Sequence, residues 1–208
     1  MESNSDISEI YPLVYTQGQK LEIDGRTVSF SIATAGLVSL PSGRVVACDP
    51  LTADRPPAFV QAVLPGRYAV DLALARAQNG FEKVAMARIK FTSRQPAVWV
   101  MALCKGQDPQ TLAPGASFGY RSESGTGAFM DAGSVSQADF AHLEDIDSLL
   151  VELTGNYKPH RYWLEQALDR RHIVVMFSTG EGAGSYASYF GIDDAGDICT
   201  LVTDFQLI

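Results

Sequence analysis

The sequence predicts an α+β fold that is mostly antiparallel β, built as a sandwich or a strongly curved sheet with two adjacent helices inserted before the last strands. Three patterns predict it: short apolar runs separated by turn residues, side chains that alternate along those runs, and one stretch of helical periodicity. We expect a single domain over residues 1–208. A hairpin-rich half spans 1–110, and a loop, the two helices and the closing strands span 111–208.

Hairpin signals dominate the first half. Turns are expected at Asp24-Gly25, Pro41-Ser42-Gly43, Pro65-Gly66 and Asn79-Gly80, each between apolar runs. Glycine and asparagine accept positive φ and proline presets the first turn angle, so these residues favour tight turns. Alternation along residues 68–74, with apolar side chains on one face, supports a strand there. The run AVWVMALC at 97–104 is apolar on both faces, which predicts a central strand covered on both sides.

Helical spacing appears only in the second half, after a Gly-, Ser- and Pro-rich connection at 105–135. One helix is expected to begin near Ser136, which can cap it, and to end before Gly155. A second helix is expected to open at Pro159, to run through Leu168 and to close at Arg170, Arg171 and His172. Three strands should follow: IVVMFST at 173–179, YASYFGID at 186–193 and ICTLVTDF at 198–205.

Charge is distributed unevenly along the chain. Residues 1–121 carry a net charge of +2 and residues 122–208 a net charge of −10, which gives −8 for the whole chain. An acidic surface steers basic partners and repels nucleic acid and anionic membranes. The longest apolar runs cover about a third of the ~20 residues that a membrane span requires. We therefore expect a protein partner, with no nucleic acid and no membrane, and the oligomeric state stays open.

The N-terminus and the cysteines predict a cytoplasmic location. The first 15 residues hold acids and no basic residue, unlike a secretory signal. Cys48, Cys104 and Cys199 are an odd number with no short spacing, which argues against a disulfide framework and against a Cys-based zinc site. The acidic stretch DDAGD at 193–197 lacks the later ligands of a calcium loop, so we expect a solvated turn, no metal and no cofactor.

Two glycine-rich segments are the candidates for chemistry: SGTGAFMD at 124–131 and GEGAGS at 180–185. The second lacks a following helix and a Walker lysine, so a phosphate loop is not favoured over a sharp hairpin loop. A hydrolase remains an alternative, in which the segments SGTGAFMD and GEGAGSYASY meet in one cleft with Asp131 or Glu181 as general base. No catalytic residue is assigned, because none of the histidines has a local partner that marks it as a base.

Aromatic and acidic residues near the late glycine-rich segment are the candidates for binding. On a strand over 186–193, Tyr186 and Phe190 share one face and Tyr189 lies on the other. One face can therefore pack in the core while the other contacts a partner. The candidate binding residues are Asp131, Glu181, Tyr186, Tyr189, Asp193 and Asp194.

An ordered set of segments resembles a known family: VACDPL at 46–51, PGRYAVDLALA at 65–75, SGTGAFMD at 124–131, FSTGEGAGSYASYFGIDDAG at 177–196 and LVTDF at 201–205. In order and spacing they resemble the uncharacterised bacterial family named domain of unknown function 4241. The resemblance implies a single bacterial domain and no established activity. The chain departs from the family pattern at Ala128, where a cysteine is common.

These observations favour binding over catalysis. The most specific expectation is an immunity protein that neutralises the toxin of a competing bacterium, because an acidic surface can cover a basic active site such as that of a nuclease. The hydrolase described above is the alternative.

Overall fold

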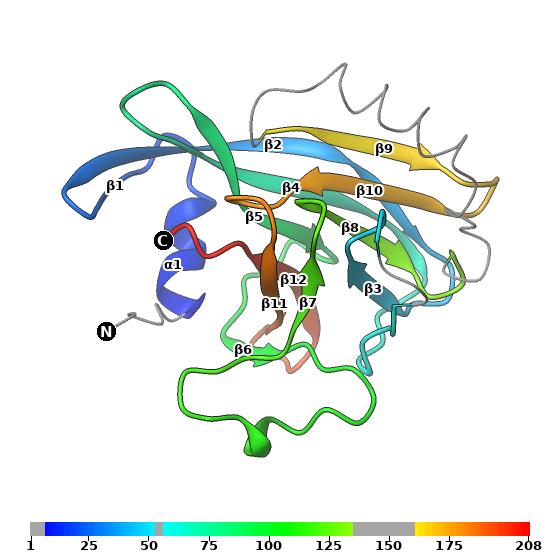
Figure 1. The fold of residues 1–208 in the computed structure, drawn as a ribbon. Coiled ribbons are helices and arrows are strands. Elements are labelled where there is room, and N and C mark those ends of the chain that lie inside the picture. The colour runs from blue at the N-terminus through cyan, green and yellow to red at the C-terminus, as the bar shows by residue number, and fades with distance from the viewer. Residues whose placement is uncertain (1–6, 53–55, 135–160) are drawn as a thin grey trace.

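Two antiparallel sheets form most of the fold in the computed structural model, which describes residues 7–52, 56–134 and 161–208 (Figure 1). The larger sheet contains β1 (Lys20–Ile23), β2 (Arg26–Leu40), β4 (Gly66–Arg76), β5 (Glu82–Lys90), β12 (Ile198–Asp204), β11 (Gly184–Ile192) and β6 (Val98–Met101), in that order. β7 (Gly119–Ser122) also pairs with β11. The smaller sheet has the order β3 (Val45–Cys48), β8 (Thr126–Asp131), β10 (Ile173–Ser178) and β9 (Trp163–Ala167). The predicted mostly antiparallel β fold is confirmed.

Local turn signals placed several strands correctly. β1 and β2 form a hairpin through Asp24 and Gly25, whose φ angles of 50° and 72° are the positive values that such a tight turn needs. β4 and β5 form the hairpin expected at Asn79-Gly80, where the Asn79 side chain accepts a hydrogen bond from the N–H of Phe81. β11 and β12 pair around the acidic turn, as the sequence predicts.

Two predicted hairpins are wrong because the chain changes sheets. The turn at Pro41–Gly43 is present, but β3 leaves β2 and pairs with β8 in the smaller sheet. Residues 59–64 form only isolated bridges, Phe59 with Cys104 and Ala62 with Arg44, and β4 pairs instead with β2. In both cases a distant partner satisfies the backbone, and a local turn signal cannot show this.

The run at 97–104 forms an edge strand and not the expected central one. β6 pairs with β11 along one edge, and Val98 and Val100 are exposed. Trp99 faces the opposite way and contacts the ring of Tyr11 at 4.8 Å between centroids. One face of the run therefore lies under α1 (Ile7–Val14), and the apolar side chains of the other face are exposed.

The helices differ from the prediction. The first predicted helix falls in 135–160, outside the described residues, and the second is wrong, because Trp163–Ala167 is the strand β9 paired with β10. His172 is therefore no helix-end cation but a buried residue of the β9–β10 turn, with Nδ1 2.9 Å from Oδ2 of Asp169. Tertiary pairing overrides a helical pattern when a neighbouring strand supplies the hydrogen bonds.

One helix was not predicted. α1 (Ile7–Val14) packs its apolar side chains on the outer face of the larger sheet, next to the C-terminal residues Leu207 and Ile208 (Figure 1). Within the described ranges, no helix is both long and apolar enough to cross a membrane.

Side-chain alternation divides the core into clusters on either face of the sheets. The inner cluster lies between the sheets and includes Leu72, Ile89, Phe129, Phe177 and Phe190. The outer face of the larger sheet packs under α1, and the outer face of the smaller sheet carries a third cluster around Met130 and Met176. β2 contacts both sheets, and at its bend the N–H of Leu37 donates to Glu165 of β9 at 2.6 Å. The inner cluster is therefore where a site between the sheets would form.

Candidate functional site: a cavity beside strand β11

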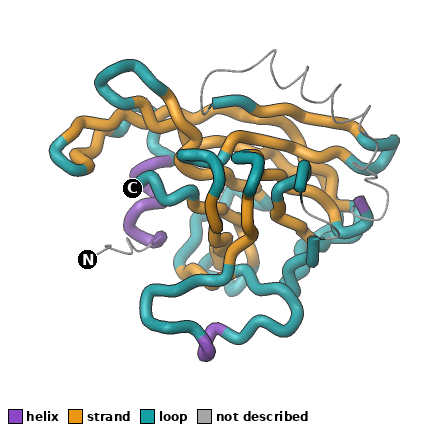
Figure 2. The backbone as a smooth tube through the Cα atoms, in the orientation of Figure 1, coloured by secondary structure: helices purple, strands orange, loops and turns teal. Residues whose placement is uncertain are grey.

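A cavity opens where the edge of the larger sheet is interrupted. β6 and β7 pair with the same edge of β11, one along Tyr189–Ile192 and the other along Gly184–Ala187. Between them residues 102–118 leave the sheet as a long loop that contains the short helix η1 (Pro109–Thr111) (Figure 2). At the root of this loop lies a cavity of about 380 Å³. Long loops held on a rigid sheet commonly carry binding residues.

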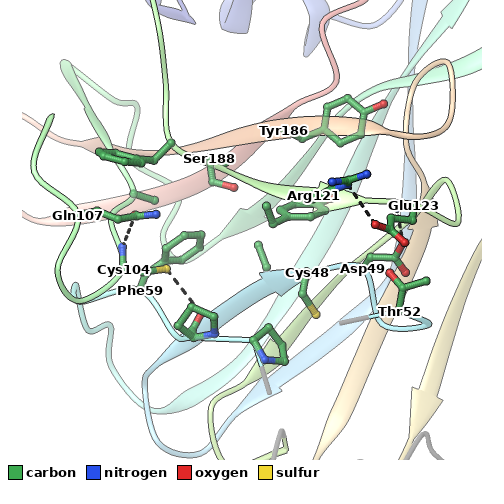
Figure 3. A pocket seen from close by; sticks show the side chains of 17 residues that line it. Cys48, Asp49, Thr52, Phe59, Cys104, Gln107, Arg121, Glu123, Tyr186 and Ser188 are labelled. Atoms are coloured by element: carbon green, nitrogen blue, oxygen red, sulfur yellow. Dashed lines mark hydrogen bonds and ion pairs between the residues drawn. The ribbon is translucent and has the colours of Figure 1, made fainter. Parts of the chain in front are cut away.

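The walls of the cavity come from four segments (Figure 3). Tyr186 and Ser188 of β11 lie on one side, and Cys48 with Asp49, at the end of β3, lie across from them. The remaining lining residues are Ala47, Thr52, Pro56, Pro57, Phe59, Ala102, Cys104, Gln107, Phe118, Gly119, Tyr120, Arg121 and Glu123. Apolar and aromatic groups therefore form much of the wall, with a few polar groups among them, as is typical of binding pockets.

Asp49 is fully buried and its carboxylate is saturated with hydrogen bonds. Oδ2 accepts the backbone N–H groups of Glu123 at 2.9 Å and of Ser124 at 2.8 Å, and the hydroxyl of Ser122 at 3.3 Å. Oδ1 accepts the N–H of Leu51 at 3.0 Å and the hydroxyl of Ser124 at 2.8 Å. A carboxylate whose lone pairs are all used in this way fixes a turn and is not poised as a base.

Asp131 also fixes a turn through hydrogen bonds, at the other end of the smaller sheet. It is fully buried, its Oδ2 accepts the N–H of Ser42 at 2.9 Å and the Ser42 hydroxyl at 2.7 Å, and its Oδ1 accepts the N–H of Gly133 at 2.7 Å. Ser42 lies in the turn where the chain passes from β2 to β3. The two buried aspartates therefore each hold a turn at which the chain changes sheets.

Two thiols face the cavity without being activated. Burial, and then the neighbouring Asp49 carboxylate, raise the pKa of the Cys48 thiol far above its ordinary value. Burial also raises the pKa of Cys104, whose Sγ lies 3.7 Å from the carbonyl oxygen of Pro57. Both groups are therefore thiols at neutral pH and contribute apolar surface to the wall.

Two tyrosines beside the cavity differ in their hydrogen bonding. The hydroxyl of Tyr186 donates to the carbonyl of Gly182 at 2.6 Å. The hydroxyl of Tyr120 is buried and, among the described residues, finds no hydrogen-bond partner. Burial raises the pKa of both phenols, most strongly that of Tyr120.

The structure separates the residues proposed from the sequence. Tyr186 lines the cavity, whereas Tyr189 lies on the opposite face of β11 and packs in the cluster under α1. The carboxylate of Glu181 pairs with Lys83. Asp193 is buried, accepts the N–H groups of Ala195 and Asp197 and pairs with Arg94 at 2.9 Å, while Asp194 is exposed on the same turn. The six candidates therefore do not form one site.

The carboxylates of the acidic half are partly internal. Nine of the 14 acids in 122–208 lie in the described ranges. Two of these, Asp131 and Asp193, are buried, so the expected acidic surface does not include them. Hydrogen bonds from the His172 side chain, and then from the backbone N–H groups of Arg171 and His172, lower the pKa of Asp169 to about 2.

No group of three or more His, Cys, Asp or Glu side chains in the described part of the chain is arranged to hold a metal ion.

The two glycine-rich segments do meet. The N–H of Thr179 donates to the carbonyl of Gly125 at 3.0 Å, and a side chain at Gly125 would begin 3.2 Å from the Cα of Gly182. The acids assigned to them point elsewhere, since Asp131 lies at the far end of β8 and Glu181 pairs with Lys83. The segment SGTGAFMD is no open loop, because Thr126–Asp131 is the fully buried strand β8.

One protein family matches most of the chain. The sequence model of one family, described as protein of unknown function (DUF4241), matches residues 38–203. The chain belongs to this family. The match takes in Asp49, the cavity and both glycine-rich segments, so the expected resemblance is confirmed. No curated protein and no solved structure matches the chain.

Sequence reasoning missed Asp49 as a site residue. Its only local signal was its place in the segment VACDPL, directly after a buried run and before a proline. The donors that make it important, at residues 122–124, lie more than 70 residues further along the chain.

Proposed function

We propose that this DUF4241 protein is a protein-binding module, and most specifically an immunity-type protein that acts in the cytoplasm and neutralises an interbacterial toxin. The observation that carries the proposal is the cavity of about 380 Å³ at the root of the loop 102–118. Such a cavity can take one anchoring side chain of a partner, and the loop beside it can add contact area.

The surface beside the cavity supports a macromolecular partner. Val98 and Val100 of the edge strand β6 are 58% and 38% exposed, and Val60, whose N–H donates to the carbonyl of Leu103, is 48% exposed. Val100 pairs with Phe190, whose ring contacts Phe59 of the cavity wall at 5.8 Å. Apolar side chains exposed side by side around a cavity are typical of a protein interface.

The charge of the chain supports a basic partner. The net charge is −8, and the exposed acids near turns include Glu123 at the cavity, Asp194 and Asp197. Complementary charge accelerates association by about 10- to 1000-fold, an advantage for a protein that must capture a toxin before it acts. A basic toxin domain with an apolar residue at its centre fits both properties.

The test is protection of growth by the gene product against the toxin encoded in the adjoining open reading frame. We expect the wild-type chain to restore growth, and Val98→Asp with Val100→Asp to abolish protection. Phe81→Asp is the control, because Phe81 is 57% exposed at the β4–β5 hairpin, away from the cavity, and takes the same charge as each of the two valine substitutions. Absence of protection by the wild type, or equal loss in the control, contradicts the proposal.

The hydrolase alternative keeps one observation in its favour, the contact between the segments at Gly125 and Gly182. It requires a carboxylate at that contact, and Glu181 is the nearest in sequence. If it holds, Glu181→Gln abolishes a hydrolytic activity while Lys83→Met, which breaks the same ion pair, retains it.

A further inference from the structure

The outer face of the larger sheet carries a second cavity, on the opposite side of the sheet from the first. Its volume is about 300 Å³, and it lies between α1, the outer face of β5 and β12, and the connection from β5 to β6. The lining residues are Tyr11, Pro12, Tyr15, Thr16, Arg88, Lys90, Thr92, Arg94, Gln95, Cys199 and Thr200. Among the described residues that line it, three are basic and none is acidic, although the chain as a whole carries −8.

Arg88 is a rigid donor at the floor of this cavity. Its Nε and Nη2 donate to Oδ2 of Asp71 at 3.2 and 3.0 Å, and its Nη1 donates to the hydroxyl of Tyr11 at 3.0 Å. The guanidinium carbon lies 4.0 Å from the centroid of the Tyr15 ring. A guanidinium has five N–H groups, so two of them remain without a partner among the described residues, and the other three fix their orientation.

Lys90 adds positive charge, and Arg94 adds hydrogen-bond donors, from two further directions. Lys90 is two residues from Arg88 on β5, so both side chains lie on the outer face; it is exposed and, within the described residues, makes no ion pair. Arg94 is anchored through Nη1 to Asp193 at 2.9 Å and to Asp197 at 3.5 Å, and its Nε and Nη2 make no hydrogen bond to a described residue. Three basic side chains therefore border one concave space: Arg88 and Arg94 are held in place by carboxylates, and Lys90 supplies the charge that no ion pair among the described residues neutralises.

We infer that this cavity is an anion site that binds the phosphoryl group of a small phosphorylated molecule. A tetrahedral oxyanion accepts hydrogen bonds from several directions, which matches donors that arrive from β5 and from the β5–β6 connection. A cavity of this volume has room for a small organic group beyond the phosphate, next to Pro12 and the two tyrosine rings. Because the chain repels anions overall, binding of one marks a specific site. The inference does not depend on the partner proposed above.

Calorimetric titration with inorganic phosphate, pyrophosphate and citrate at constant ionic strength tests the proposed anion site. We expect saturable binding at one site, tightest for pyrophosphate, weakened about tenfold in Lys90→Ala and abolished in Lys90→Glu. Lys105→Ala is the matched control, because it removes one exposed lysine from the loop 102–118 and should leave binding unchanged. No saturable binding of either phosphate probe up to about 10 mM overturns the site. Equal weakening in the control, or citrate binding as tightly as pyrophosphate, overturns the assignment to a phosphoryl group.

Discussion

Ser124 holds the buried carboxylate of Asp49 with both its backbone N–H and its hydroxyl, each at 2.8 Å, across 75 residues of sequence. Ser124 lies in the turn that carries the chain from β7, on the larger sheet, to β8, in the smaller one. The same carboxylate is part of the wall of the cavity beside β11. The shape of the cavity therefore depends on a contact that also joins the two sheets.

Replacing Asp49 tests this dependence. Asp49→Ala leaves the N–H groups of Glu123 and Ser124 and the Ser124 hydroxyl without their buried acceptor, so we expect the free energy of unfolding to fall by about 3 kcal/mol or more. Urea unfolding at pH 7 measures the loss. Asp194→Ala, at an exposed turn position, should change stability by less than about 0.5 kcal/mol. An equally small loss of unfolding free energy in the two variants would show that the fold does not depend on Asp49.

The two tyrosines at the cavity should respond in opposite directions to loss of the hydroxyl. Tyr120→Phe removes a buried hydroxyl that lacks a partner among the described residues, so stability should rise by about 1 kcal/mol. Tyr186→Phe removes the hydrogen bond to Gly182, so stability should fall by about 1 kcal/mol. Each variant is the control for the other. A destabilised Tyr120→Phe would mean that its hydroxyl has a partner after all.

Acid should remove the stabilisation that Asp169 provides. Because the folded-state pKa of about 2 lies below the ordinary value of about 3.9, this contribution is complete above about pH 5 and is lost as the pH falls towards 2. We expect Asp169→Asn to melt at a lower temperature than the wild type at pH 6 and at the same temperature near pH 2. Thermal unfolding across this range measures the difference in melting temperature between the two proteins. A difference that stays constant down to pH 2 would refute the lowered pKa of Asp169.

Cysteine accessibility should differ among the three thiols. Cys48 and Cys199 are buried and Cys104 is half-buried, and burial is the largest cause of the raised pKa of each. We expect iodoacetamide at pH 7.5 to alkylate Cys104 slowly and to spare the other two until the protein is unfolded. Peptide mass spectrometry assigns the modified residue. Modification of Cys48 at the rate of Cys104 would mean that the cavity opens to solvent more widely than its geometry indicates.

Elements with local signals could be predicted from the sequence. The hairpins β1–β2, β4–β5 and β11–β12 are joined by turns whose residues accept the required backbone angles, and pairing with the adjacent strand follows. The division of β11 into faces was also predictable, because strand side chains alternate: Tyr186 and Phe190 lie in the inner cluster and Tyr189 in the outer one.

The remaining features depend on contacts between distant parts of the chain. β9 carries apolar residues at Trp163, Leu164 and Ala167 that suit a helix as well as a strand, and pairing with β10 decides in favour of the strand. The cavity forms because β6 and β7 share one edge of β11, which no local pattern reveals. Asp131 and Glu181 were proposed as site residues from their glycine-rich surroundings, and their partners Ser42 and Lys83 lie far away in sequence.

Hydrogen–deuterium exchange of the chain, alone and bound to the toxin encoded beside it, tests the binding proposal most directly. We predict slowed exchange at 59–62 and across 98–118, the segments that border the cavity beside β11, and unchanged exchange in α1. A stable complex that leaves 98–118 unprotected, or the absence of any complex at low salt, would contradict the account.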